Sequence, residues 1–392
     1  MKTIDPLSTP SHRRLLGLIR QAGPISRVEL SALTGLAAAS ITNIVRDLLG
    51  HGFVLESGQA ASTGGKPRTL LEIAAASVHA AGVHIESHGV TYVVTDMAGA
   101  LVGRQRTPPL ALGPQDAEEI AREIDALLRR LGVARSTLVG MGVVVASTES
   151  PAAQGRPPLA EFITTLSDLT GLRVVIDNDA TAAAIGEHWV AEPGQRGTFA
   201  CVYMGPSIES AILYEGMPLR GSRPTAGALG HVTVDRNGPA CWCGNRGCVD
   251  LYAGVEATLR AAADAGISSE VTVPGATDLR QFDELARKAM HGDPRAEAVV
   301  RYSAEALADA VVTLANISDV DRIVLAGPCF AIAGSAYIQS LNSTLSRRAF
   351  ARDTHEVKVA LATDVRGAVA IGASALALQD ALSVKPLEAR RP

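Results

Sequence analysis

The chain lacks the features that mark a disulfide-stapled, secreted or membrane protein. It has five cysteines in 392 residues, an odd number and too few for a disulfide framework. Although 47% of its residues are hydrophobic and only 19% are charged, it contains no apolar run of ~18 or more residues, the length that a membrane span requires. The N-terminal segment also lacks the apolar core of a signal peptide, since it begins MKTIDPLSTPSHRR. We therefore expect a cytoplasmic protein with no membrane partner.

Length and charge divide the chain into a small basic part and a larger acidic part. At ~100 to 200 residues per domain, its length predicts two or three domains. The net charge is -4, but residues 1–75 carry eight Lys and Arg against five Asp and Glu, which leaves -7 for the remainder. A basic N-terminal part on an acidic body is expected if only the first part meets a polyanion.

The N-terminal residues predict three short helices. Ser11 is placed to cap the first helix, and Gly23 followed by Pro24 to end it. Ser26 and Glu29 have the spacing of a capping box for the second helix. The apolar residues that predict the three buried faces are Leu15, Leu16 and Ile19; Leu30 and Leu33; and Ile41, Ile44, Val45, Leu48 and Leu49.

The third of these helices has the features of a recognition helix. Thr34 and Gly35 form a tight turn before it, and its outer face is polar, short-chained and basic. Two short helices joined by a Gly-containing turn are typical of a helix-turn-helix, whose second helix enters a major groove. Ala37 departs from the pattern, because Ser or Thr would cap the helix better. The residues predicted to contact bases or phosphates of a double-stranded DNA operator are Ser40, Thr42, Asn43 and Arg46.

A basic hairpin follows the third helix. The segments FVLESG and RTLLEI predict two strands around a loop at 60–67. Lys66 and Arg68 at its tip could reach phosphates or a minor groove, as the wing of a winged helix-turn-helix does. We therefore predict a DNA-binding domain at 1–76. The alternative is a three-helix cap that packs against the body, but the basic excess and the basic hairpin both favour nucleic-acid binding.

The remaining residues predict an α/β body with two related halves. Residues 80–105 and 198–221 each have the pattern of a three-stranded meander. Buried strands are predicted at 138–146 and 173–180, and Ala-rich helices at about 116–131, 254–265, 279–290, 293–316 and 366–382. We predict a first lobe at 77–197 and a second at 198–392, with a C-terminal helix that could return to the first lobe. A ligand would lie in the crevice between the lobes.

One short segment offers a complete tetrahedral donor set for Zn²⁺. The candidate ligands are His231, Cys241, Cys243 and Cys248. Four protein ligands leave no open position, so the metal would be structural. Gly244 and Gly247 would let the chain turn tightly between the cysteines. The alternative is a group of three buried or redox-active thiols. Cys201 and Cys329 are expected to be ordinary strand or core residues.

These motifs resemble those of the ROK family of repressors, uncharacterised reading frames and sugar kinases. AGALGHVTVDRNGPACWCGNRGCVDLYAG closely matches the zinc signature of that family. ISRVELSALTGL, together with the Gly-Gly-Lys-Pro-Arg wing, is similar to the DNA-binding domain of its repressor branch. The resemblance spans about residues 11–380. It implies an actin-like, ribonuclease-H-like two-lobed body that binds a sugar between its lobes, usually as a homodimer or homotetramer.

The resemblance also shows where the family's kinases hold ATP, and this chain differs at both places. Their Asp-Ile-Gly-Gly-Thr cradle is here HIESH at 84–88, and their Gly-Thr-Gly-Ile-Gly-Gly-Gly cradle is GPSIESA at 205–211. Pro206 donates no N–H, while Glu86 and Glu209 place negative charge where phosphates would lie. We therefore expect no ATP binding and no catalytic residue.

Only part of the family's sugar contacts remain. Asn178, Asp179 and His231 match them, with Asp179 the remnant of the kinase base. Asp250 replaces a Glu and is one methylene shorter, and Ala228 replaces a Glu that accepts sugar hydroxyls. A lost charge-assisted hydrogen bond costs about 1.5 to 3 kcal/mol, which disfavours a common hexose such as glucose. An alternative interpretation makes Asp179 the N-cap of the following helix.

Together these features predict a DNA-binding transcriptional regulator, a repressor of carbohydrate-related genes that is not an enzyme. A small carbohydrate or derivative bound by Asn178, Asp179, His231 and Asp250 would change the angle between the lobes and the spacing of two DNA-binding domains in an oligomer. Two alternatives stay open. One is an active ATP-dependent sugar kinase with a fused DNA-binding domain, and the other is a regulator that senses a non-sugar effector.

Overall fold

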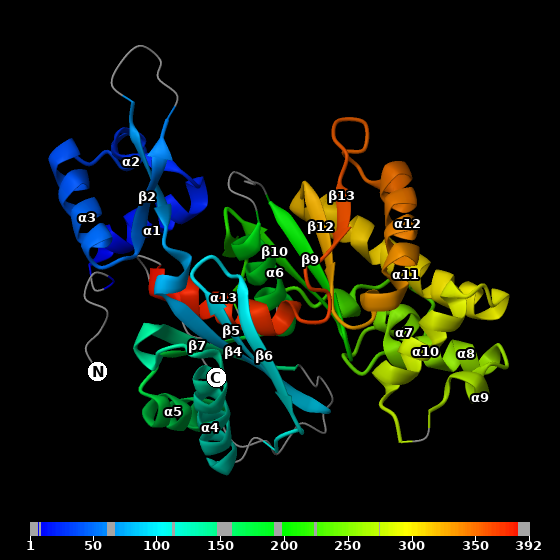
Figure 1. The fold of residues 1–392 in the computed structure, drawn as a ribbon. Helices are drawn as coiled ribbons and strands as arrows, with labels where there is room; N and C mark the ends of the chain where they lie inside the picture. The colour runs from blue at the N-terminus through cyan, green and yellow to red at the C-terminus, as the bar shows by residue number, and fades with distance from the viewer. Residues whose placement is uncertain are drawn as a thin grey trace.

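The computed structural model describes residues 7, 9–60, 67–111, 114–146, 159–191, 198–222, 226–273 and 275–382. These residues form three β-sheets, one in the N-terminal part and one in each lobe of an α/β body (Figure 1). The predicted fold class is confirmed. Among the described residues, no single helix is long and apolar enough to cross a membrane, although α2 (Arg27–Thr34) and α3 (Ala38–Gly50) pass that test jointly as a bent pair.

The N-terminal domain packs three helices against a small sheet of strand order β1-β3-β2. Besides α2 and α3, its elements are α1 (Pro10–Ala22), β1 (Ile25–Ser26), β2 (Val54–Gln59) and β3 (Thr69–Ile73). The predicted capping box is confirmed, because the Ser26 side chain accepts from the Glu29 N–H and the Glu29 carboxylate accepts from the Ser26 N–H. The predicted hairpin strands correspond to β2 and β3.

Two details of these helices differ from the prediction. Ser11 does not cap α1, which begins one residue earlier at Pro10, since the fixed φ and missing N–H of proline suit the first turn of a helix. Leu33 is 49% exposed, because the eight-residue α2 buries Leu30 alone. The other predicted apolar residues of the three helices are buried, except Leu49, which is half-buried.

The sheets of the two lobes have the same plan, which confirms the predicted repeat. Each begins with an antiparallel meander and continues with two parallel strands, in the orders β6-β5-β4-β7-β8 and β11-β10-β9-β12-β13. The first sheet consists of β4 (His79–Glu86), β5 (Gly89–Asp96), β6 (Leu101–Thr107), β7 (Leu138–Val145) and β8 (Val174–Asp177). The second consists of β9 (Phe199–Met204), β10 (Ile208–Tyr214), β11 (Met217–Pro218), β12 (Arg322–Ala326) and β13 (Lys358–Leu361).

Helices cover both sheets and join the lobes. In the first lobe they are α4 (Pro114–Leu131), α5 (Leu159–Thr170) and α6 (Asp179–Val190). In the second they are α7 (Asp250–Ala253), α8 (Val255–Asp264), α9 (Ser268–Val271), α10 (Asp278–Met290), α11 (Pro294–Ser318) and α12 (Phe330–Arg348). Single 3₁₀ turns are η2 (Ala75–Ser77), η3 (Arg135–Thr137) and η5 (Leu229–His231). The last helix, α13 (Ala368–Leu382), packs on β4 and β7 and along α6, so it returns to the first lobe (Figure 1).

Candidate functional site

The first candidate surface is the outer face of α3. Helices α2 and α3 cross at 119°, within the ~90 to 120° of helix-turn-helix motifs. The connection between them is three residues long, from Gly35 to Ala37. As expected from its side chain, Ala37 forms no side-chain cap on α3. The arrangement therefore has the geometry in which the second helix can enter a major groove.

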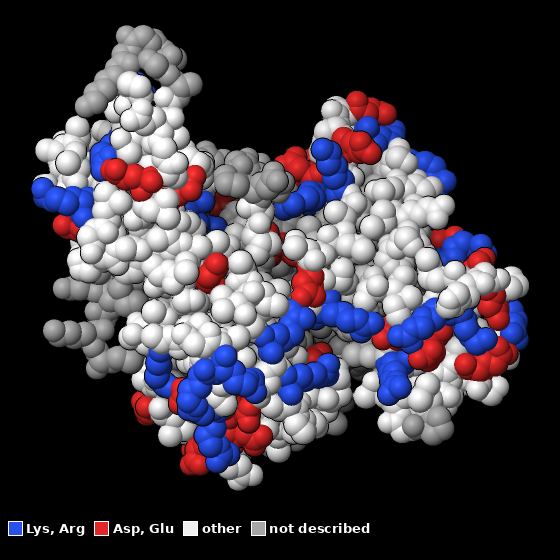
Figure 2. Space-filling view, in the orientation of Figure 1, with Lys and Arg blue, Asp and Glu red and all other residues white. Residues whose placement is uncertain are grey.

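The four predicted contact residues of α3 are all exposed, on the face opposite its buried apolar residues. Arg46 donates to the Asn43 amide oxygen at 2.6 Å, and the Thr42 hydroxyl donates to the Ala38 carbonyl oxygen at 2.8 Å. Figure 2 shows basic side chains at the outer edge of the domain, over α3. On the hairpin, Arg68 is exposed, whereas Lys66 lies outside the described residues.

The second candidate site lies where the parallel strands of the first lobe end. His84 on β4 pairs with Val144 on β7, which pairs with Asp177 on β8, so the carboxyl ends of three strands meet in one row. Asp179 follows β8 and begins α6. In open α/β sheets ligands bind outside the carboxyl ends of the strands, and Figure 2 shows the body hollowed between the two lobes.

A buried ion pair occupies this edge. His84 Nε2 lies 2.8 Å from Asp179 Oδ1, and both side chains are almost fully buried. Burial by itself lowers the pKa of His84, but the hydrogen bond and charge of Asp179 and the charge of Glu86 outweigh it and raise that pKa overall. Glu86 in turn lies 3.6 Å from His88 and 3.7 Å from Arg106. The segment that holds phosphate in ATP-binding relatives is thus filled by ion pairs.

The residues beside Asp179 complete this edge. Asn178 is the N-cap of α6, since its side chain accepts from the Thr181 N–H at 2.7 Å. The alternative that Asp179 caps this helix is therefore wrong, and Asp179 is instead the first helical residue. Asp177 is buried and lies 2.6 Å from Arg220, which follows β11 in the second lobe. The predicted contact Asn178 thus uses its oxygen within the helix.

The second cradle, residues 205–211, comprises the turn between β9 and β10 and the first residues of β10, and several of its backbone donors are already used. The N–H of Gly205 donates to Ser207, and that of Ser210 to Gly227. The Ile208 N–H donates to Asp250 Oδ1 at 3.1 Å. Since Pro206 has no N–H, little of this turn is free to bind phosphate. Asp250, predicted to bind sugar, accepts this bond and so holds the turn, and Ala228 is exposed.

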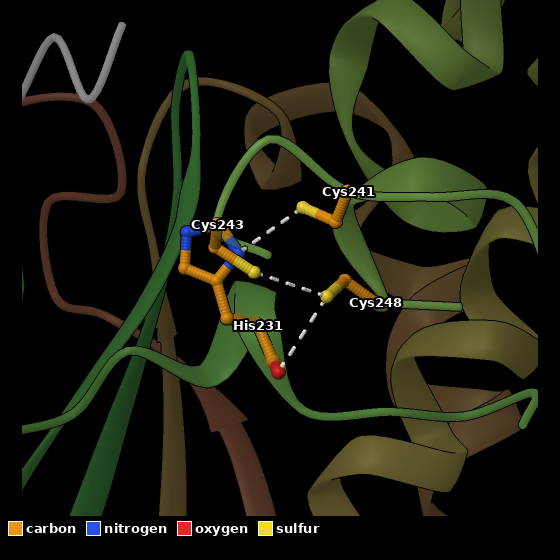
Figure 3. A group of neighbouring side chains, drawn as sticks. All are labelled: His231, Cys241, Cys243 and Cys248. Carbon is orange, nitrogen blue, oxygen red and sulfur yellow. Dashed lines mark hydrogen bonds between the residues drawn. The ribbon is translucent and has the colours of Figure 1, made fainter. Parts of the chain in front are cut away.

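The third candidate site is the loop that ends at Cys248. The four predicted ligands converge (Figure 3), with one ligand atom of each within 4.8 Å of all the others. Cys243 Sγ lies 3.7 Å from Cys248 Sγ, and Cys241 Sγ lies 3.6 Å from His231 Nδ1. A tetrahedron with Zn–S bonds of about 2.3 Å has edges of about 3.7 Å, so the donor set fits zinc.

The backbone of the loop is built to bring these donors together. Bridges between Thr233 and Cys248 and between Ala240 and Arg246 close it. Gly247 has a φ of 62°, and a Cβ there would lie 1.7 Å from the Asp235 carbonyl oxygen, so this position requires glycine. Burial and the neighbouring cysteines raise the pKa of Cys248 to about 12, because thiolates so close together repel one another. A divalent cation offsets that repulsion.

The structure also shows site residues that the sequence analysis did not identify. The sequence shows that His84 differs from the Asp of the kinase cradle, but it does not predict that His84 pairs with Asp179. Arg220, the partner of Asp177, carries no motif. Tyr203 at the end of β9 is buried, and burial, followed by the charges of Asp179 and Glu86, raises its pKa well above the usual value. Cys201 and Cys329 are buried, as predicted.

Comparison with known proteins gives one consistent result. Residues 81–380 match the ROK family. The chain is 24% identical to the xylose repressor of Caldicellulosiruptor bescii over 92% of this chain and 93% of that protein. It is 25% identical to the DNA-binding transcriptional dual regulator NagC of Escherichia coli over 79% and 78%.

Among solved structures, a ROK family transcriptional regulator described as a homologue of the E. coli MLC protein superposes with a TM-score of 0.73. The sequences are 20% identical, and the match covers 95% of this chain and 96% of that one. Because that coverage includes the N-terminal domain, the likeness extends to the whole architecture. Together with the match over residues 81–380, it leads to one conclusion: this chain belongs to the ROK family.

Proposed function

We propose that the chain is a transcriptional repressor of carbohydrate-related genes, whose DNA affinity is set by a small carbohydrate or derivative in the interlobe cleft. The observation that carries this proposal is the exposed polar face of α3, which crosses α2 at the helix-turn-helix angle. The relatives over most of the chain are regulators that repress or control transcription by name. We assign residues 1–76 to DNA binding, 77–197 to the first lobe and 198–392 to the second lobe, apart from α13, which packs on the first.

The effector would contact the row of polar groups at the strand ends. We assign its contacts to Asp179, beside Asn178 at the strand ends of the first lobe, and to His231 and Asp250 in the second lobe. The names of two relatives point to D-xylose and N-acetylglucosamine as first candidates. Ligand binding between lobes changes the angle between them and, in a homodimer or homotetramer, the spacing of the two winged domains.

The zinc ion would have a structural role. Three thiolates and one imidazole leave no open position for substrate or water. The loop begins at His231 and leads into Asp250, which holds the β9–β10 turn. Zinc would therefore fix the second-lobe side of the cleft.

The kinase alternative is disfavoured by both cradles. Glu86 is tied into ion pairs where phosphate would lie, and the N–H groups of Gly205, Ile208 and Ser210 are already bonded. We expect millimolar Mg-ATP to leave the thermal unfolding midpoint unchanged and to be hydrolysed no faster with any sugar present. Sugar-dependent hydrolysis that Asp179→Asn abolishes would establish the kinase instead.

Two experiments test the proposed function. In a mobility-shift assay at moderate salt, we expect the purified chain to bind a duplex from the region beside its own gene more tightly than an unrelated duplex of equal length. In a thermal-shift screen, we expect a monosaccharide, an amino sugar or an oligosaccharide to raise the unfolding midpoint. Equal binding of both duplexes would refute the repressor, and stabilisation by sugar phosphates or by none of these compounds would favour a non-sugar effector.

A further inference from the structure

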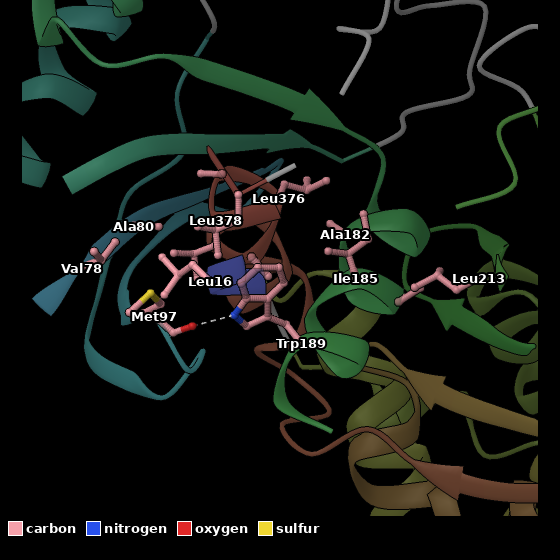
Figure 4. Close-up of a cluster of buried hydrophobic side chains, with 14 of the residues drawn as sticks. Leu16, Val78, Ala80, Met97, Ala182, Ile185, Trp189, Leu213, Leu376 and Leu378 are labelled. Carbon is pink, nitrogen blue, oxygen red and sulfur yellow. Dashed lines mark hydrogen bonds between the residues drawn. The ribbon is translucent and has the colours of Figure 1, made fainter. Parts of the chain in front are cut away.

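Helix α1 joins the N-terminal domain to the body through a buried contact. Leu16 lies in the same hydrophobic cluster as Met97, Trp189 and Leu378 (Figure 4). The Arg20 guanidinium lies over the Trp189 ring, 3.7 Å from its centre, and donates to the Trp189 carbonyl oxygen at 3.2 Å. Burial lowers the pKa of Arg20 to about 10, so the side chain stays charged at neutral pH and forms a cation–π contact largely shielded from water.

The first lobe holds Trp189 from the other side. Its indole Nε1 donates to the Met97 carbonyl oxygen at 3.1 Å, in the turn between β5 and β6. Gly99 in the same turn lies so close that a Cβ there would be 2.7 Å from the indole Cδ1. The Met97 N–H donates to the carbonyl oxygen of Ala75 in η2, the segment that links the N-terminal domain to the body. The indole therefore lies between α1 and the β5–β6 turn of the first lobe, and this turn is hydrogen-bonded to η2.

The two residues before Trp189 contact the second lobe. The Glu187 carboxylate accepts from the N–H of Thr363 at 2.8 Å and from its hydroxyl at 3.2 Å, just after β13. His188 packs against the β10–β11 turn, where a Cβ on Gly216 would lie 2.4 Å from its Nε2. The last turn of α6 therefore contacts all three parts of the molecule.

The first residue of the same helix lies at the cleft. Asp179 is ten residues before Trp189, a distance of about 15 Å at 1.5 Å per residue. Between them α6 packs on α13 backbone to backbone, since a Cβ on Gly372 would lie 1.9 Å from the Ala182 carbonyl oxygen. Interiors packed at this density have low compressibility and transmit strain, so α6 provides a rigid path between Asp179 and Trp189.

We propose that the last turn of α6, Glu187 to Trp189, is the joint through which cleft occupancy sets the orientation of the winged domain, with Arg20 and Trp189 as its positioning residues. This inference rests on the proposed function and adds the route by which the two sites communicate. Without the Arg20 contact the winged domain still binds DNA, but its affinity no longer depends on whether the cleft is occupied.

Intrinsic tryptophan fluorescence provides the first test. It has two tryptophans, and the second, Trp242, is exposed in the loop of candidate zinc ligands. Trp242→Phe makes Trp189 the sole indole, and zinc content checks that the loop is kept. The wild-type chain first selects a duplex from a random-sequence library, and this duplex is labelled. We expect Trp189 emission to change as the labelled duplex binds, with the same midpoint as the rise in its anisotropy. Unchanged emission at saturating DNA overturns the proposal.

The second test asks whether the cleft acts through Arg20. Asp179→Asn breaks the buried pair with His84 at the other end of α6, and we expect it to change the affinity for the selected duplex about fivefold or more. In an Arg20→Gln background the same substitution should change affinity less than twofold, while Arg20→Lys should restore part of the effect. Arg14→Gln is the matched control, because Arg14 lies exposed on the same helix.

The outcomes separate the two proposals. An Asp179→Asn effect of equal size in the Arg20→Gln and Arg14→Gln backgrounds, or no Asp179→Asn effect at all, overturns the joint while leaving the repressor intact. If the wild-type chain selects no duplex from the library, the proposed function itself fails. Thermal unfolding of each variant confirms that it is folded before its DNA affinity is compared.

Discussion

At the scale of single residues, His84 has the largest consequence for function. It lies where the first cradle of the kinases that the chain resembles begins with Asp, and its imidazole is paired with Asp179 at 2.8 Å. A carboxylate that accepts a hydrogen bond from a buried imidazole is an acceptor of fixed orientation rather than a base that is free to take a proton. His84 thus adds to the effects of Glu86, Pro206 and Glu209 against kinase chemistry, while a polar group remains at the strand ends.

The His84 pair makes stability depend on pH in a defined direction. The folded-state pKa of His84 is raised above its ordinary value, about 6.5. Its contribution is therefore fully present below about pH 6.5 and is lost as pH rises through the folded-state pKa. We expect His84→Gln to lower the free energy of unfolding by about 1.5 to 3 kcal/mol at pH 6, and by clearly less at pH 9.

Urea unfolding at both pH values measures this difference. The control is His291→Gln, because His291 is exposed and its loss should cost little at either pH. A His84→Gln effect that is the same at pH 6 and pH 9 would show that the imidazole is neutral in the folded chain.

Residue predictions from the sequence were reliable where the partner is near in the chain. The Ser26–Glu29 capping box spans three residues and was predicted correctly. The partner of Asp179 lies 95 residues away, on strand β4, and that of Asp177 lies in the other lobe. Such pairs depend on strand order and lobe packing, which no local pattern encodes.

At the scale of elements, the loop of the four candidate zinc ligands and the recognition helix give separate predictions. For the loop, we expect Cys243→Ser to reduce bound zinc from about one ion per chain to none. Hydrogen exchange should become faster across the loop, because its fold depends on the metal. Elemental analysis checks the metal content.

Cys329→Ser serves as the control for this loop, since Cys329 is buried in the core of the second lobe. It should keep its zinc. A wild-type chain purified without chelators that holds no metal, or a Cys243→Ser variant that holds as much as the control, would instead support a simple thiol cluster.

For the recognition helix, we expect Arg46→Ala to weaken operator binding by about 1 to 3 kcal/mol if it reads a base, and to reduce the salt slope by about one if it contacts a phosphate. Anisotropy titrations at several salt concentrations distinguish these results. Arg14→Ala, on the exposed side of α1, should change neither quantity as much. Equal effects of the two substitutions would show that α3 is not the DNA-reading element.

Element positions were largely predictable, with informative omissions. The two meanders and the Ala-rich helices were identified because strand and helix periodicities are local. Helices α5, α7, α9 and α12 and strands β12 and β13 were not predicted. Strand β12 lies inside its sheet, and a short buried apolar run cannot be distinguished from a helix segment by pattern alone.

At the scale of the whole molecule, the account requires that two winged domains act together. Operators read by helix-turn-helix proteins commonly have two half-sites about one helical turn apart. We therefore expect light scattering to give a molar mass at least twice that of one chain at micromolar concentration. If the chain is a monomer and binds a two-half-site operator without cooperativity, a change in the spacing of two winged domains cannot be the mechanism.

The distribution of charge along the sequence predicts part of the domain organisation. A basic N-terminal part and an acidic body predict which part meets DNA, and the family match begins at residue 81, after the basic part. The sequence did not reveal how firmly the two parts are joined. The Arg20–Trp189 contact brings together residues 169 positions apart, so it follows only from the assembled fold. The alternative of a helical cap that packs on the body was right about the contact of α1, although not about the function that we infer.

The most direct test of the account is the affinity of the chain for its operator in the presence of its effector. The measurement is the anisotropy of a labelled duplex titrated with wild-type chain, with and without a saturating amount of the sugar that gives the largest thermal shift. We expect the sugar to change the dissociation constant about fivefold or more, and we expect Asp179→Asn to abolish that change. An identical dissociation constant with and without every sugar that binds would contradict it.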